Sequence, residues 1–66
     1  MTGKERQMVI KLHSFEDNEE FLANVQRITI VRSYGDGSQI GIAGFGFINV
    51  RENVNRIQQM ILDYVL

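Results

Sequence analysis

The stretch that decides the predicted fold is Gln39–Val50, which reads QIGIAGFGFINV. Its side chains alternate with a period of two residues, the spacing of an extended strand whose successive side chains point to opposite faces. Its large apolar residues divide between the two faces: Ile40, Ile42, Ile48 and Val50 on one, Phe45 and Phe47 on the other. The segment therefore predicts one long strand, bent or bulged at a glycine.

A turn and two further strands precede this segment. Tyr34–Ser38 reads YGDGS, and a hairpin loop is expected there because glycine accepts a positive φ and aspartate bonds the local backbone. The β-branched run before the loop predicts a strand from about Arg27 to Ser33. An apolar alternation near the N-terminus predicts the first strand, over Met8–Leu12.

Two helices are expected in the rest of the chain. Ser14–Glu20 offers Ser14 or Asp17 as an N-cap and places acids where the helix dipole favours them. A short helix with Phe21, Leu22 and Val25 on its apolar stripe would follow. A C-terminal helix would begin after Asn49 or Asn53, with these apolar residues at helical spacing: Val54, Ile57, Met60, Ile61, Tyr64 and Val65.

These elements predict an α+β fold with the order β-α-β-β-α. A right-handed crossover and a hairpin give a three-stranded antiparallel sheet of order 1-3-2, with both helices on one face. The chain has 66 residues, so it is expected to be a single domain over 1–66, with 1–7 as a flexible lead-in. The predicted sheet residues of the core are Met8, Ile10, Leu12, Ile28, Ile30, Ile40, Ile42, Ile48 and Val50.

The opposite face of the predicted sheet is the main functional clue, because no layer of this chain would cover it. An uncovered apolar patch of this kind marks an interaction surface. We expect the face to pack against its own copy in a homo-oligomer or to capture a partner protein. Its residues are Val9, Lys11, His13, Thr29, Val31, Phe45 and Phe47.

Composition narrows the classes of function. Seven Lys and Arg residues against eight Asp and Glu give a net charge of −1, which is not the strongly basic balance of many nucleic-acid-binding domains. The chain has no cysteine, so neither a disulfide framework nor a thiolate zinc site is expected. No stretch approaches the roughly 20 apolar residues that a membrane span needs. The sequence predicts a cytoplasmic, non-enzymatic binding protein without a cofactor, such as a regulatory or inhibitory adaptor of phage or bacterial type.

An alternative function comes from Ala43–Val50, AGFGFINV, which resembles the RNP1 octapeptide of the RNA-recognition motif. In that family the third strand presents aromatic rings on which single-stranded bases stack. The resemblance implies that Phe45 and Phe47 would have this role. The positive charges of Lys11 and Arg27 are expected to add salt-dependent contacts to RNA or DNA. The resemblance is confined to these eight residues, because Val9 stands where the family's second motif has an aromatic ring and no fourth strand is predicted.

Overall fold

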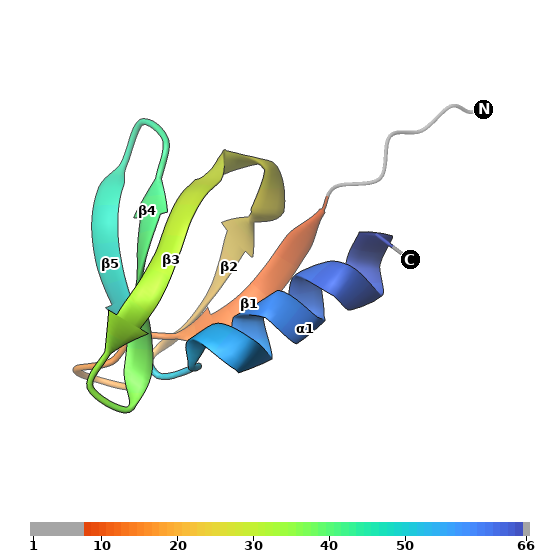
Figure 1. Ribbon diagram of the computed structural model, residues 1–66. Helices are drawn as coiled ribbons and strands as arrows, with labels where there is room; N and C mark the ends of the chain where they lie inside the picture. The colour runs from red at the N-terminus through yellow and green to blue at the C-terminus, as the bar shows by residue number, and fades with distance from the viewer. Residues whose placement is uncertain (1–7, 66) are drawn as a thin grey trace.

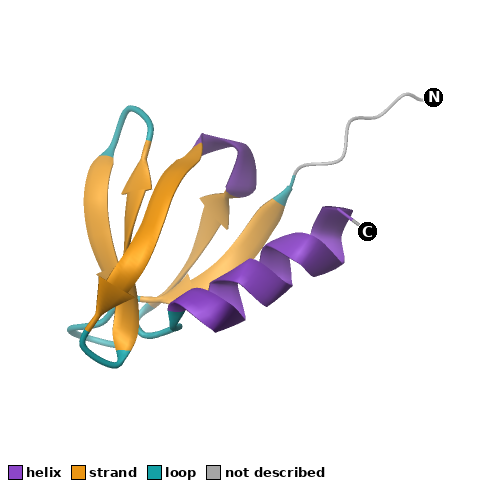
Figure 2. Cartoon of the chain, in the orientation of Figure 1, coloured by secondary structure: helices purple, strands orange, loops and turns teal. Residues whose placement is uncertain are grey.

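The chain folds into two antiparallel sheets and one C-terminal α-helix (Figure 1). The computed structural model describes residues 8–65, with side chains as far as Asp63, so the predicted lead-in over residues 1–7 lies outside the described residues. Figure 2 shows that strands make up most of the fold. The elements are β1 (Val9–His13), β2 (Glu20–Asn24), the 3₁₀ helix η1 (Val25–Arg27), β3 (Ile28–Tyr34), β4 (Gly37–Ile42), β5 (Gly46–Val50) and α1 (Val54–Val65).

A loop and strand β2, which pairs with β1 as a hairpin, stand where the first helix was predicted. The N–H of Ser14 donates to the carbonyl of Glu19 at 2.9 Å and closes the loop between the two strands. Asn18 has a φ of 60°, a left-handed conformation that asparagine adopts more readily than most residues. The predicted helix is wrong because serine, aspartate and asparagine favour tight loops for the same reason that they favour helix N-caps, namely side-chain bonds to nearby backbone.

β2 follows the two-residue period of a strand. Phe21 is half-buried and Ala23 buried, whereas Glu20 and Leu22 are exposed. In a strand, residues two apart share a face. The stripe that would have grouped Phe21 with Leu22 on a helix therefore does not exist, and Leu22 points away from Phe21.

The segment predicted as one bent strand is two strands joined by a turn. The N–H of Phe45 donates to the carbonyl of Ile42 at 3.0 Å, and Gly44 has a φ of +81°. This is the geometry of a type II turn, whose third residue needs a positive φ. Gly46 follows with a φ of +114°. The glycines that were expected to bend a single strand reverse the chain instead.

β3 pairs with β4 across the predicted hairpin loop, and its register contains a bulge between Ile28 and Ile30. A bulge adds one residue to its strand, so the side chains that follow it change face. Ile30 consequently lies opposite Gly41 and is exposed, whereas Val31 packs against the core. The prediction of Ile30 as a core residue is wrong for this reason.

The two sheets meet where the end of β1 crosses the end of β5, a contact that we call the joint. An isolated bridge pairs Ser14 with Val50 there. Two backbone hydrogen bonds accompany it: the Arg51 N–H donates to the His13 carbonyl at 2.8 Å, and the Phe15 N–H donates to the Asn49 carbonyl at 2.9 Å. From the joint the sheets diverge (Figure 1), with a cleft lined by residues of both sheets on one side and α1 on the other.

α1 occupies the side of the diverging sheets that lies between β1 and β3 (Figure 1). Asn53, one of the two predicted N-caps, accepts a hydrogen bond at Oδ1 from the N–H of Arg56 at 2.8 Å. Ile57 is only 1% exposed and carries the apolar face of α1 into the core. The buried apolar residues are Ile10, Leu12, Ala23, Ile40, Val50 and Ile57.

The predicted architecture is therefore wrong in its sheet and its first helix, whereas the predicted C-terminal helix is present as α1. In place of a three-stranded sheet of order 1-3-2 under two helices, residues 8–65 form a two-stranded sheet, β1-β2, a three-stranded sheet, β3-β4-β5, and one α-helix. No helix in this part of the chain has the length and apolar character needed to cross a membrane.

Candidate functional site

The residues of the predicted interaction face do not share one surface. Val9 and Val31 lie beside α1, where they line shallow grooves on either side of it. Lys11 is exposed on β1. Thr29 lies at the bulge of β3 and donates a hydrogen bond from Oγ1 to a carbonyl of β4 at 3.2 Å. An open face built from these residues does not form.

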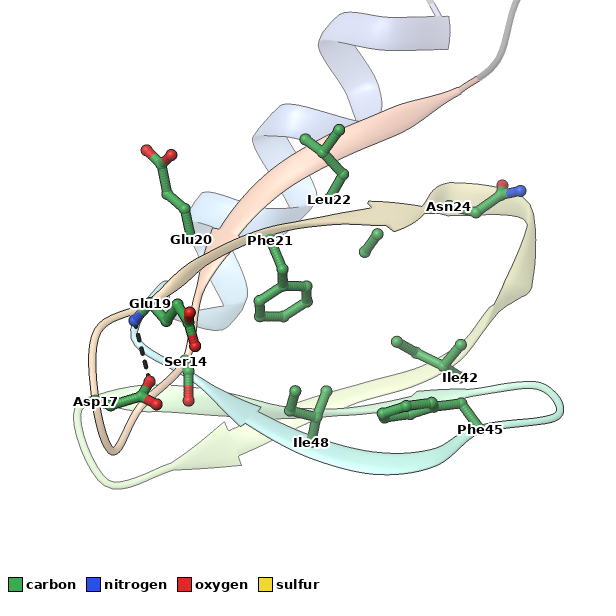
Figure 3. A pocket seen from close by; sticks show the side chains of 11 residues that line it. Ser14, Asp17, Glu19, Glu20, Phe21, Leu22, Asn24, Ile42, Phe45 and Ile48 are labelled. Carbon is green, nitrogen blue, oxygen red and sulfur yellow. Dashed lines mark hydrogen bonds between the residues drawn. The ribbon is translucent and has the colours of Figure 1, made fainter.

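Phe45 and Phe47, which the RNP1 resemblance placed together, also lie on different surfaces. Phe45 belongs to the β4–β5 turn and lines the cleft between the sheets (Figure 3). Phe47 lies opposite Gly41 on the outer face of the three-stranded sheet. The two side chains are 70% and 62% exposed, respectively. Arg27 accepts a hydrogen bond at its carbonyl from the N–H at the start of the turn, so it lies near Phe45.

The cleft between the sheets has a volume of about 480 Å³. Figure 3 shows Phe21 projecting into it from β2, with Ile42, Ile48 and Phe45 on the opposite sheet. These side chains give the cleft a mainly apolar lining. Water solvates such a lining poorly, so a ligand that covers it gains free energy from the apolar area removed from water.

The free edge of β2 borders this cleft. The bonds from the Ser14 N–H to the Glu19 carbonyl and from the Val25 N–H to the Met8 carbonyl fix which β2 residues face β1. By antiparallel alternation the backbone groups of Glu20 and Leu22 point the other way. Within residues 8–65, β2 has β1 as its one neighbour in the sheet, so no described strand pairs with these groups and they form a free strand edge. Leu22 itself is 63% exposed.

One end of the cleft is acidic. Asp17, Glu19 and Glu20 line it there, and the Asp17 carboxylate accepts a hydrogen bond from the N–H of Glu19 at 3.1 Å. Residues 13–26 contain four carboxylates and no lysine or arginine, a net charge of −4. Lys11 reaches one of them, Glu20, at 3.8 Å, in an exposed pair that contributes little. The cleft end therefore favours a ligand that brings positive charge.

His13 and Glu52 reinforce the joint between the sheets. The backbone N–H of His13 donates to Oε1 of Glu52 at 3.0 Å, and its Nδ1 donates to Oε2 at 2.7 Å. The buried hydroxyl of Ser38 donates to the Glu52 carbonyl at 2.7 Å. Glu52 thus ties β1, β4 and the segment before α1 together. His13, predicted as part of an open interaction face, serves this structural contact.

Acid is expected to weaken the joint through Glu52. Burial raises the pKa of this carboxyl, but the hydrogen bonds from the side chain and backbone of His13 outweigh burial, so the pKa lies below its ordinary value of 4.5. A group whose folded pKa is lowered stabilises the protein above its unfolded pKa, and this contribution is lost as the pH falls through the folded value. The urea midpoint of the native protein should therefore drop between about pH 5 and pH 3 more steeply than that of Glu52→Gln.

Circular dichroism at a series of pH values measures both midpoints. The exposed carboxylates of the β1–β2 loop are present in both proteins, so the difference between the two curves isolates Glu52. Parallel curves would contradict the stabilising role assigned to its ionised form.

Comparisons with known proteins add no evidence on the function of the cleft. Comparison with models of known protein families, with curated proteins and with solved structures finds no match. Within the part of the chain that the structure describes, no group of three or more His, Cys, Asp or Glu side chains could hold a metal ion. A function must therefore be inferred from the surface chemistry of the cleft and of the two sheets.

Proposed function

We propose that this protein is a non-enzymatic binding module that takes up an extended segment of a partner protein in the cleft. One observation supports the proposal: the free edge of β2 lies beside an apolar cleft that no described part of the chain covers. A segment that pairs with this edge continues the β1-β2 sheet, which is the recognition mode called strand addition. Such a protein acts as an adaptor, by holding its partner.

The lining of the cleft supports a particular chemistry for that segment. In an added strand every second side chain points into the cleft, beside Phe21 and against Phe45 and Ile48. Apolar side chains at alternate positions remove this lining from water. A lysine or arginine at one end lies next to Asp17 and Glu19. Proline is excluded at the pairing positions because it lacks the N–H that the edge of β2 requires.

A synthetic peptide tests the proposal. The probe alternates valine with threonine, ends in two lysines and carries a fluorophore, and its binding is followed by anisotropy. Phe45→Ala should weaken binding by about 1 kcal/mol or more, since it removes a large part of the cleft wall. Asp17→Asn and Glu19→Gln should weaken it further, and more at low salt than at high salt.

A matched pair of modified peptides tests the backbone contact without changing the protein. N-methylation at alternate residues that face β2 removes donors and should abolish binding, whereas N-methylation at the intervening residues should be tolerated. Phe47→Ala is the protein control, since its ring lies on another surface. Equal effects of the two methylation patterns would contradict strand addition. Self-association that is lost in Phe45→Ala would instead assign the cleft to a second copy of the chain.

A further inference from the structure

The outer face of the β3-β4-β5 sheet is a second, separate surface. The strand register places three of its residues, Ile30, Gly41 and Phe47, in one row across the sheet. The next row contains Arg32, Gln39 and Asn49. No aspartate or glutamate occupies either row. This absence of carboxylates contrasts with the acidic end of the cleft.

Aromatic rings lie open to solvent on this face. Phe47 lies across Gly41, where a Cβ atom would come within 3.1 Å of its ring. Tyr34 is exposed as well, and Phe15 meets it edge to face with the ring centroids 5.0 Å apart. Exposed rings on a sheet are platforms on which other planar groups can stack.

Two arginines accompany the rings. The guanidinium carbon of Arg32 lies 5.9 Å from the centroid of Phe47, and the side chain of Gln39 accepts hydrogen bonds from Arg32 at 3.0 and 2.9 Å. The guanidinium carbon of Arg51 lies 4.9 Å from the centroid of Phe15. Among the described residues the ion pairs involve Lys11 and His13, and neither arginine has a carboxylate within 4.0 Å. Both positive charges are therefore available to an anionic ligand.

We propose that this arginine–aromatic face, defined by Phe15, Arg32, Tyr34, Phe47 and Arg51, binds single-stranded nucleic acid. Bases stack on the exposed rings of Phe47 and Tyr34, and Arg32 and Arg51 contact the phosphates. A duplex does not suit the face because its bases are already stacked on one another. Binding of nucleic acid to this face does not require the cleft. A negative result for one surface therefore does not contradict the proposal for the other.

The acidic loop between β1 and β2 limits how far the binding surface for nucleic acid extends. It begins at Glu16, directly after Phe15, so a phosphate near Phe15 is repelled by Glu16 and Asp17. Neutralising these carboxylates, in Glu16→Gln combined with Asp17→Asn, should therefore tighten binding of an oligonucleotide. The same substitution should weaken binding of the lysine-bearing peptide in the cleft, because Asp17 lines the acidic end there.

The test uses fluorescently labelled oligothymidylate and oligouridylate of about ten nucleotides, with anisotropy at low salt. Both single strands, or one of them, should bind, and a duplex of equal length should not. Phe47→Ala should weaken binding by about 5- to 140-fold, which is the loss of one base stack at a factor of ten per 1.4 kcal/mol. Arg32→Ala should reduce the slope of log affinity against log salt by about 0.7 for each phosphate that the arginine neutralises.

Matched controls come from the same chain. Phe45→Ala removes the same ring from the cleft, and Arg56→Ala removes the same charge from α1, so both should leave oligonucleotide binding unchanged. If Phe47→Ala fails to fold by circular dichroism, Phe47→Leu retains apolar cover over Gly41 while deleting the ring. The proposal is overturned by an absence of binding at low salt, by binding that Phe47→Ala or Phe47→Leu leaves intact, or by concentration-dependent self-association of the free protein that these variants abolish.

Discussion

Gly37→Ala is expected to remove most of the stability of this protein. A Cβ atom at this position would collide with the backbone carbonyl oxygen of Val50 and lie 3.0 Å from the carbonyl oxygen of Arg51. These are backbone atoms of β5 and of the joint, so they cannot turn aside as a side chain would. Overpacking costs about 1–3 kcal/mol, and more where the obstacle cannot relax. A domain of this size is stable by only about 3–5 kcal/mol.

Urea unfolding followed by circular dichroism measures the loss, with Gly46→Ala as the matched control. Gly46 has a φ of +114°, but nothing lies within 4 Å of a Cβ atom added there. Its replacement should therefore incur only the backbone penalty, about 1–2 kcal/mol for a left-handed residue. If Gly37→Ala were as stable as Gly46→Ala, the carbonyl oxygens of Val50 and Arg51 would have to lie farther from Gly37 than in this structure.

Ile57→Ala should produce the second large effect, a loss of about 2–5 kcal/mol. Ile57 is 1% exposed and is the buried α1 residue among the described side chains, with Met60 and Ile61 packed against the core beside it. Truncating it leaves a cavity between the sheets on the side that α1 closes. At the upper end of this range the protein is unfolded at room temperature, because the whole stability is of the same order.

The control for Ile57 is Leu62→Ala on the same helix. Leu62 is 41% exposed, so its truncation removes little buried apolar area and should cost well under half as much as Ile57→Ala. Thermal or urea unfolding of the two variants provides the comparison. Equal losses would mean that α1 is held by its outer surface and that the core does not depend on Ile57.

Several elements of the fold could be predicted from the local sequence, because interactions between neighbouring residues favour them. The first strand was predicted over Met8–Leu12 and lies at Val9–His13. The strand predicted from Arg27 to Ser33 lies at Ile28–Tyr34. Apolar alternation and β-branched side chains favour an extended backbone whatever surrounds them. The hairpin loop between β3 and β4 followed from glycine and aspartate for the same kind of reason.

The errors arose where one local signal permits two structures. Ser14–Glu20, SFEDNEE, contains the residues of a helix N-cap and equally those of a loop. The apolar run Phe21–Ala23 that follows fits a short strand as well as a helix. Gly44 and Gly46 permit a bend as well as a reversal. Contacts between strands decide between these outcomes, namely the pairing of β4 with β5 and the joint between β1 and β5.

The two proposed binding surfaces were predicted less well than the strands, because each depends on the register between strands. Phe45 and Phe47 are two residues apart and share a face in any uninterrupted strand. The turn places one in the cleft and the other on the outer sheet. Phe21, Ile42 and Ile48 were assigned to the packed interior, and nothing local to them shows that one side of the diverging sheets is left uncovered.

The joint also has a consequence for how the chain folds. His13 and Glu52 are 39 residues apart, and closing a loop of that length costs about 3 kcal/mol of chain entropy. The β1–β2, β3–β4 and β4–β5 hairpins need only local closure and form on the microsecond scale. The joint is therefore expected to form last. A nascent chain can hold all three hairpins and still lack the cleft, so the proposed binding site is complete only after Glu52 has been synthesised.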